Sequence, residues 1–381
     1  METMQPTLRN GRSVWDKQNM PQSEFDGRVA RARAAMARDK IDALLVYGFA
    51  YNDYADPTYL SNFTIRLPNG AMMILPANSE PVIVFEGNSK NIPSLRDITW
   101  VKDLRSAGDC AVGAVECLKE KGILAAQIGF CGVTELMPAA QLQKLRDALE
   151  RARVVEAGGI IRNMRMVKSG FEKEQIKRAA AMISRCLDAM AAARFPEISE
   201  RKIAAWVRRD IHLQGAEDVR ILLGRAKEPD WRLRPPEEGV LADGEPIVLY
   251  IGCSYERYWA ERIRTFTATL TGLSQISVKP IDDVYATAIG EIKPGLLASA
   301  VAQNLTSLAR QAGIITIDHY GIGTGIGLAP VEAPQISSNS RVALAEGMAL
   351  TLRIAGCDAE VGTYMTGDTL ILECDRTAVL V

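Results

Sequence analysis

The first 160 residues alternate between helical and strand-like patterns of apolar residues. Apolar side chains recur at helical spacing over 23–39, and a second helical pattern over 112–122 ends in glycine. Short apolar runs at 41–48, 71–87 and 127–132 are typical of buried strands, and the middle one contains a turn. Strands that alternate with helices in this way predict an α/β domain, in which helices cover a sheet.

The pattern changes near residue 163. One long helical pattern covers 165–195, and a second helix is predicted over 199–214. Runs rich in β-branched residues dominate after this point, with a further helical segment at 278–312. The second half is therefore expected to be α+β, with antiparallel strands and helices on one face. We expect two domains, residues 1–160 and residues 165–381.

Composition and charge narrow the class of protein. Of the 381 residues, 48% are apolar and 24% are charged, and the formal net charge is -1. A nearly neutral globular chain has no general electrostatic attraction to nucleic acid or to anionic membranes. The chain contains neither a signal-peptide pattern nor a run of about 18 apolar residues, so we expect a cytoplasmic protein. Its seven cysteines lack the spacing of a zinc module or a disulfide framework.

Four glycines stand at every second position in the stretch "GIGTGIG", residues 321–327. This spacing is neither the dinucleotide fingerprint G-x-G-x-x-G nor a phosphate-binding loop, which needs a Lys-Ser/Thr pair after its last glycine. Glycine at alternate positions indicates a strand or bend whose backbone comes close to another group. Thr324 lies between the middle pair, on the free side of this segment.

Several phrases, in one order along nearly the whole chain, resemble the creatinase/aminopeptidase P/prolidase family. In chain order they are "IDALLVYG", "TYLSNF", "RMVKSGFEKEQIKRAAAM", "YIGCSYERYWAERIRTF", "KPG", "GIGTGIGL" and "EGMALTLRI". The resemblance implies an α/β N-terminal domain followed by an α+β C-terminal domain with the pita-bread fold. By resemblance alone, it also implies a homodimer.

The resemblance also implies that the family's metal ligands are changed in this chain. Metal-dependent members bind two ions through Asp, Asp, His, Glu and Glu. The corresponding positions here are Tyr250, Glu261, Thr324, Arg353 and Gly367. Of these, Glu261 alone ligates a metal well, threonine is a poor ligand, and a guanidinium repels a dication. We therefore expect neither a metal nor a cofactor.

Creatinase is a member of the family that works without metal, through a histidine and glutamates. Its catalytic histidine would fall near Trp231 and Arg232, and a second family histidine at Val331, so this chain lacks both. We expect other residues to line the pocket. The expected catalytic residues are Glu261, Glu332, His319 and Tyr250, and the expected substrate-binding residues are Arg353, Arg232, Tyr258, Thr324 and Tyr320.

These roles follow from side-chain chemistry, and several have structural alternatives. Glu261 and Glu332 suit general acid/base work, Tyr250 can donate to a developing oxyanion, and arginine grips an anion such as a carboxylate at two points. Equally, Glu261 and Arg353 can form a salt bridge that fills the site. Arg264 has a structural interpretation, because metal-dependent relatives also have it, and His319 can be either a packed ring or a proton carrier.

Three functions follow. The first is a metal-independent, creatinase-type hydrolase or lyase that cleaves or rearranges a C–N or similar bond of a small anionic, nitrogen-containing metabolite. The second is a catalytically inactive relative that binds a small molecule, a peptide or a protein partner. The third is an unconventional metallopeptidase that uses Glu261, Glu332 and Asp368. The replacement of the ligands by functional polar residues favours the first, and the loss of both histidines favours the second.

Overall fold

The computed structural model describes residues 14–50, 53–65, 69–194, 198–269 and 272–374, and the backbone of 377–379. The chain folds into two units, Gly11–Arg165 and Met166–Val381. The sequence pattern places the division near residue 160, a few residues earlier. The boundary lies at the end of helix α7 (Gly158–Met166).

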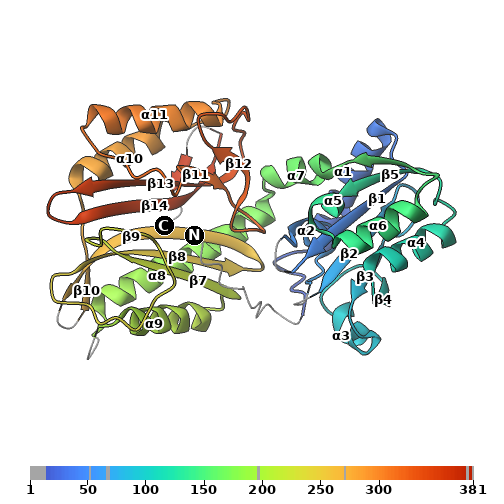
Figure 1. Cartoon of the computed structure of the whole chain (residues 1–381), viewed down its shortest axis with the longest axis horizontal. Helices are drawn as coiled ribbons and strands as arrows, with labels where there is room; N and C mark the ends of the chain where they lie inside the picture. The colour runs from blue at the N-terminus through green and yellow to red at the C-terminus, as the bar shows by residue number, and fades with distance from the viewer. Residues whose placement is uncertain are drawn as a thin grey trace. The chain divides into compact units, whose positions relative to one another are not determined.

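The N-terminal unit is a mixed six-stranded sheet with helices packed against it (Figure 1). Its strand order is β4-β3-β2-β1-β5-β6. The strands are β1 (Ala43–Phe49), β2 (Gly70–Pro76), β3 (Val82–Glu86), β4 (Asp103–Ala107), β5 (Gln127–Cys131) and β6 (Arg153–Glu156). Besides α7, the helices are α1 (Gln22–Asp39), α2 (Ala55–Ser61), the short 3-10 helix η1 (Ser89–Asn91), α3 (Ile92–Arg96), α4 (Cys110–Glu120), α5 (Val133–Leu136) and α6 (Ala139–Ala148).

The continuous burial of β1 shows that this sheet is covered on both faces. All but the last residue of β1 are buried, as expected for a strand with helices on both faces. Ala43, Leu45 and Tyr47 belong to a core shared with α4 and α6. The expected α/β N-terminal domain is confirmed.

The C-terminal unit is an antiparallel nine-stranded sheet of order β12-β11-β13-β14-β9-β8-β7, to which β10 and β15 add at β9 and β14. The strands are β7 (Asp218–Arg225), β8 (Pro246–Tyr255), β9 (Tyr258–Thr269), β10 (Gly272–Gln275), β11 (Gly323–Gly325), β12 (Glu332–Ile336), β13 (Ala349–Asp358), β14 (Gly362–Leu372) and β15 (Thr377–Val379). The helices are α8 (Gly170–Ala192), α9 (Glu200–Leu213), α10 (Lys279–Glu291) and α11 (Ala298–Gln311). This arrangement confirms the expected α+β domain.

The helices of this unit cover one face of the sheet, as the sequence predicts: Leu352 packs with α10 and α11, and Arg262, in the same row of paired residues, donates to Ser184 of α8. In Figure 1, α10 and α11 lie beside β13 and β14, and α8 and α9 lie beside β8 and β7. Helix α8 starts at a capping box between Ser169 and Glu172, and it packs against β8 and β9. Leu350, Leu352 and Ile354 of β13 point into a core formed with α10 and α11. Residues between them therefore point to the other face of β13, which is free to carry polar side chains.

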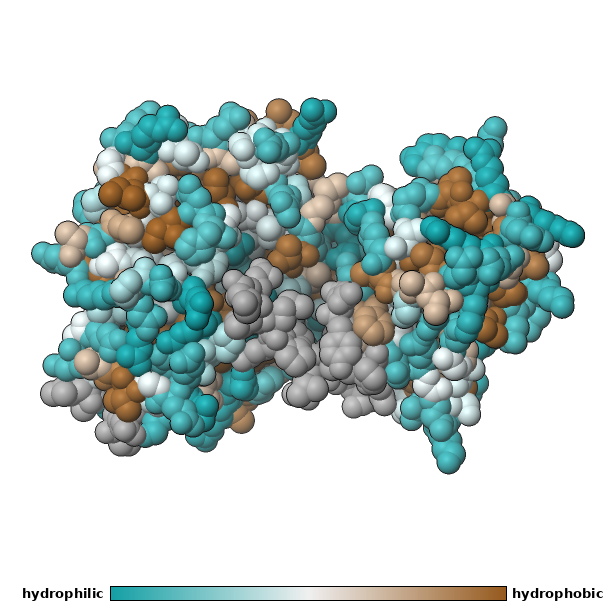
Figure 2. Space-filling model, in the orientation of Figure 1, coloured by the Kyte–Doolittle hydropathy of each residue, from teal (hydrophilic) through white to brown (hydrophobic). Residues whose placement is uncertain are grey.

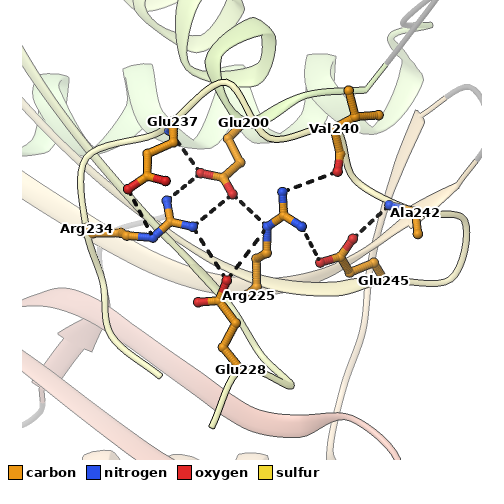
Figure 3. A network of polar contacts seen from close by, with 8 residues as sticks. All are labelled: Glu200, Arg225, Glu228, Arg234, Glu237, Val240, Ala242 and Glu245. Carbon is orange, nitrogen blue, oxygen red and sulfur yellow. Dashed lines mark hydrogen bonds and ion pairs between the residues drawn. The ribbon is translucent and has the colours of Figure 1, made fainter. Parts of the chain in front are cut away.

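A loop over residues 226–245 joins β7 to β8 and is fixed by a buried carboxylate (Figure 3). The Glu200 side chain is 0% exposed and accepts hydrogen bonds from Arg225 at 2.7 Å and from Arg234 at 2.6 Å. The backbone N–H of Glu237 donates to the same carboxylate at 3.0 Å. Because a buried carboxylate needs such partners, the loop and the start of α9 are held together.

The surface is largely hydrophilic on the face seen in Figure 2, with apolar residues in small groups. Large apolar side chains that are exposed, such as Leu213 at the end of α9 and Ile315 in the segment between α11 and β11, come from separate parts of the chain. Among the helices of the described residues, none has the length and apolar character needed to cross a membrane.

Candidate functional site

Two rows of paired residues across the C-terminal sheet define the candidate site. Residues directly opposite each other in neighbouring strands point to the same face. The first row joins Arg220, Gly252 and Glu261, on β7, β8 and β9. The second row runs through Leu222, Tyr250, Ile263, Gly367 and Arg353, from β7 to β13. Four of the five positions that correspond to family metal ligands therefore share one face of the sheet.

Hydrogen bonds and an ion pair connect these residues into one network. The Tyr250 hydroxyl donates to Glu261 Oε2 at 2.8 Å, and Arg353 Nη2 lies 3.6 Å from Glu261 Oε1. Arg353 Nη2 also donates to Thr351 Oγ1 at 3.2 Å, and the hydroxyls of Thr351 and Thr324 are 3.4 Å apart. The structure thus brings Tyr250, Glu261, Arg353 and Thr324 together, as the resemblance implies.

The centre of the site is buried, and burial changes the chemistry of its phenol. Tyr250 is 5% exposed and Glu261 is 7% exposed. Burial, and then the negative charge of Glu261, raise the pKa of Tyr250 well above its ordinary value. Tyr250 therefore stays protonated at neutral pH, and its hydroxyl is a hydrogen-bond donor to Glu261.

The alternating glycines allow the backbone of β11 to lie against its neighbours. A Cβ atom at Gly323 would come within 2.0 Å of the Thr351 carbonyl oxygen, and one at Gly325 within 2.1 Å of the Ala333 carbonyl oxygen. No side chain fits in either place. Thr324 stands between these glycines and points toward Thr351.

Glu332, one of the predicted catalytic residues, has a lysine as its partner. It forms a buried ion pair with Lys168, with Nζ 3.0 Å from Oε2 and side chains 1% and 4% exposed. Its Oε1 accepts a hydrogen bond from the Ala329 backbone at 3.0 Å. This pair fixes the segment after the glycines to the start of the C-terminal unit. A catalytic role for Glu332 remains a prediction.

His319 and Tyr320 form an aromatic group with Trp231. The ring centroids of Trp231 and Tyr320 are 5.3 Å apart, and those of His319 and Tyr320 are 4.4 Å apart. The Tyr320 hydroxyl accepts a hydrogen bond from the Leu233 backbone, and its ring packs near Tyr250 in the same apolar cluster. His319 is exposed and lies with Trp231 at a depression that is open to solvent, between the loop over 226–231 and the β13–β14 hairpin.

Arg232 and Tyr258 lie away from this centre. Arg232 is exposed, next to the buried Trp231. Tyr258 is three residues before Glu261 on β9 and so points to the opposite face, where its hydroxyl donates to Glu172 at 3.1 Å. A contact of either residue with a substrate remains a prediction, and nothing in the described contacts links them to Arg353.

The surroundings of Arg264 agree with the interpretation that this residue is structural. Asp368 Oδ1 accepts from Arg262 at 2.9 Å and from Arg264 at 2.7 Å, on the helix-covered face of the sheet.

Because Asp368 and Glu261 point to opposite faces and Glu332 is paired with Lys168, these three carboxylates do not converge. In the described arrangement they do not form the metal site of the third hypothesis.

Three residues of the site region are absent from the sequence predictions: Lys168, Arg220 and Thr351. Lys168 and Thr351 lie in phrases that carry the family resemblance, and Arg220 lies on β7, before the family's site motifs. The Arg220 guanidinium stands 5.8 Å from the centroid of the Tyr250 ring. The two-residue spacing of Arg220 and Leu222 along β7 predicts that they share a face, but the register of three strands is needed to place Arg220 in one row with Glu261.

Comparison with known proteins identifies the protein family to which the chain belongs. Residues 174–373 match metallopeptidase family M24, and residues 28–167 match the creatinase/prolidase N-terminal domain. A probable dipeptidase PepE of Mycobacterium tuberculosis is 25% identical over 361 residues, 91% of each chain. A Xaa-Pro dipeptidase of Pyrococcus horikoshii is 24% identical over 251 residues, 63% of this chain and 70% of its own. The crystal structure of the prolidase from the same organism superimposes with a TM-score of 0.76 at 17% identity, over 93% of this chain and 97% of that one.

The chain belongs to metallopeptidase family M24, and the expected membership of the creatinase/aminopeptidase P/prolidase family is confirmed. The expected pita-bread C-terminal domain is confirmed as well. The expectation of a metal-independent, creatinase-type enzyme that is not a metallopeptidase is wrong. Relatives that match most of the chain are named dipeptidases, and this points to peptidase chemistry instead.

The residues at the centre of the site do not fit the pair of metal ions that the family name implies. The Glu261 carboxylate accepts from Tyr250 and faces the guanidinium of Arg353, which cannot ligate a metal. In the ranges that the structure describes, no group of three or more His, Cys, Asp or Glu side chains is arranged to hold a metal ion. What this site offers to a ligand is a carboxylate, a phenol and guanidinium groups.

Proposed function

We propose that the protein acts on short peptides, with dipeptides as the size class. The observation that supports this most directly is the similarity over 91% of the chain to a protein named a probable dipeptidase. The similarity to an Xaa-Pro dipeptidase supports peptides whose second residue is proline. Membership of a peptidase family adds to both, because it makes hydrolysis of the peptide bond the reaction to test first.

The polar residues of the site suit the recognition of a peptide. In this proposal the Glu261 carboxylate, held by Tyr250 at 2.8 Å, accepts a hydrogen bond or a proton from the bound peptide. The Thr324 hydroxyl and the guanidinium of Arg353 provide donors on the same face. The aromatic group of His319, Tyr320 and Trp231 offers an apolar wall near Tyr250.

A dipeptide panel tests the proposal. The purified protein is incubated with alanyl-proline, alanyl-alanine, glycyl-leucine and other dipeptides, as isolated and after addition of manganese or zinc salts, and the released amino acids are quantified. We expect release from at least one dipeptide, and a loss of at least tenfold in rate for Glu261→Gln. Arg310→Gln serves as control, since Arg310 is exposed on α11. If no dipeptide is cleaved under any condition, the proposed hydrolysis of dipeptides is wrong.

We also propose that the protein is a cytoplasmic homodimer that binds neither nucleic acid nor membranes. The family resemblance supports the dimer, and the nearly neutral net charge of -1 supports the absence of polyanionic partners. Light scattering tests the dimer directly. A mass near 41.6 kDa at micromolar concentration would contradict it.

A further inference from the structure

The candidate site contains more positive than negative charge. Arg220 and Arg353 both lie close enough to Tyr250 for their charges to act on its phenol. The two come from opposite ends of the residue rows, Arg220 on β7 and Arg353 on β13. Within the described residues, the one carboxylate at ion-pair distance from either guanidinium is that of Glu261, which approaches Arg353.

Arg353 is incompletely satisfied by the protein. Its side chain is 15% exposed, and its one side-chain hydrogen bond to a described residue runs from Nη2 to Thr351. Nε is buried and has no acceptor in the described part of the chain. At 3.6 Å, Glu261 Oε1 is too distant for a good hydrogen bond, and Glu261 Oε2 already accepts from Tyr250. A guanidinium has five N–H donors, so most of those on Arg353 remain available.

Arg220 is half-buried and has an aromatic contact in place of an ionic one. Its guanidinium lies 5.8 Å from the Tyr250 ring centroid, and no described carboxylate forms an ion pair with it. Its row neighbour Gly252 has no side chain, and the phenol of Tyr250 occupies the space over this glycine, with Arg220 at its ring and Glu261 at its hydroxyl. A partly buried cation without a counter-charge is costly, and a bound anion would remove this cost.

We infer that Arg220 and Arg353 form a binding site for a small carboxylate, placed over Tyr250 and Glu261. Two planar guanidinium groups suit the two oxygens of a carboxylate, and two positive charges exceed the single negative charge of Glu261 by one. The inference rests on the proposed function for its physiological ligand: in a short peptide this carboxylate is the C-terminal one. Peptides that lack it, such as C-terminal amides, are then poor ligands.

Calorimetric titration of the full-length protein tests the inference without any variant. The probes are alanyl-proline, its C-terminal amide, succinate and inorganic phosphate. We expect alanyl-proline to bind at least tenfold more tightly than the amide, and succinate to bind more tightly than phosphate. Equal affinity for the acid and the amide overturns the inference, and so does a preference for phosphate or the absence of any binding by both alanyl-proline and succinate.

Variants then assign the effect to the two arginines. Arg220→Gln and Arg353→Gln should each reduce the acid-to-amide ratio at least fivefold, while Arg310→Gln leaves it unchanged. Unaltered ratios in both site variants would overturn the inference. The two proposals can fail separately. If the protein binds alanyl-proline through its carboxylate but cleaves no dipeptide, the carboxylate site stands and the proposed hydrolytic function is wrong.

Discussion

The phenol of Tyr250 extends along β8 until its hydroxyl lies over Gly252. A Cβ atom at residue 252 would come within 3.0 Å of that hydroxyl oxygen, closer than side-chain contacts ordinarily allow. The hydroxyl is held there by its 2.8 Å hydrogen bond to Glu261, which is paired with Gly252 across the sheet. The glycine of "YIG" therefore makes room for the tyrosine two residues before it.

Replacement of this glycine should displace the hydroxyl. We expect Gly252→Ala to lower the free energy of unfolding by about 1–3 kcal/mol, as added volume in packed sites does, because the buried ring has little room to turn. Urea denaturation measures the change. The matched control is Gly290→Ala in α10, where an added Cβ meets no atom within 4 Å and should stabilise the helix by about 0.5–1 kcal/mol. Equal effects of the two substitutions would contradict this account.

The Lys168–Glu332 pair should be structural. Removal of one partner leaves an unpaired buried charge, so we expect Lys168→Met to cost about 3–5 kcal/mol of unfolding free energy. Combining it with Glu332→Leu should recover most of the loss, since an apolar pair of similar volume replaces the ions. Thermal melts of the single and double variants measure the effect. A Glu332→Gln variant that melts like the wild type but cleaves no peptide would instead support the predicted catalytic role.

Coupling between Arg353 and Glu261 should be small. The distance of 3.6 Å and the partial exposure of Arg353 suggest a double-mutant coupling energy below about 1 kcal/mol. The cycle uses Arg353→Met and Glu261→Gln, with unfolding free energies from urea titration. A coupling of several kcal/mol would show that the pair serves mainly to fill the site. A weak coupling leaves the guanidinium available to a ligand.

Glu200 should make stability depend on pH in the acid range. Burial alone raises the pKa of Glu200, but the hydrogen bonds from Arg234, the Glu237 backbone and Arg225 outweigh it and lower this pKa from 4.5 to about 2. A depressed carboxyl pKa contributes stability that is complete above the unfolded value and is lost as the pH falls toward the folded one. We expect a loss on the order of 2–3 kcal/mol between about pH 5 and pH 2.

Comparison with Glu200→Gln isolates this contribution. The variant cannot titrate at residue 200, so its unfolding free energy should fall less steeply over the same acid range. Urea denaturation at a series of pH values, with the exposed Glu238→Gln as the control, measures both slopes. If the unfolding free energies of wild type and Glu200→Gln changed in parallel with pH, the assignment of a depressed pKa to Glu200 would be wrong.

The sequence predicted the fold because its signals are local and ordered. Helical spacing, the capping box at Ser169 and the family phrases each need only a short segment to be recognised. The joint placement of Tyr250, Glu261, Thr324 and Arg353 was also predictable, since the resemblance supplies the register of four strands at once.

The remaining parts of the site depend on information that one strand does not contain. Arg220 reaches Tyr250 only through the pairing of β7 with β8, and Lys168 reaches Glu332 across 164 residues of sequence. For Tyr258 the strand pattern is itself informative, because a three-residue offset from Glu261 places it on the other face of β9, and its predicted contact with a substrate remains a prediction. The function was mispredicted because the prediction relied on the replaced metal ligands. Their replacement indicates what the site no longer binds, and it does not identify the substrate of a relative.

The anchoring of the 226–245 loop by Glu200 has a consequence for its motion. Glu237 N–H donates to the Glu200 carboxylate, Arg234 exchanges backbone hydrogen bonds with Leu223, and Leu241 N–H donates to the Ile198 carbonyl. Because one carboxylate joins these attachments, the segment should open as a single cooperative unit. Amide protons along it would then exchange with deuterium at one common rate, and acid that protonates Glu200 would quicken them all together.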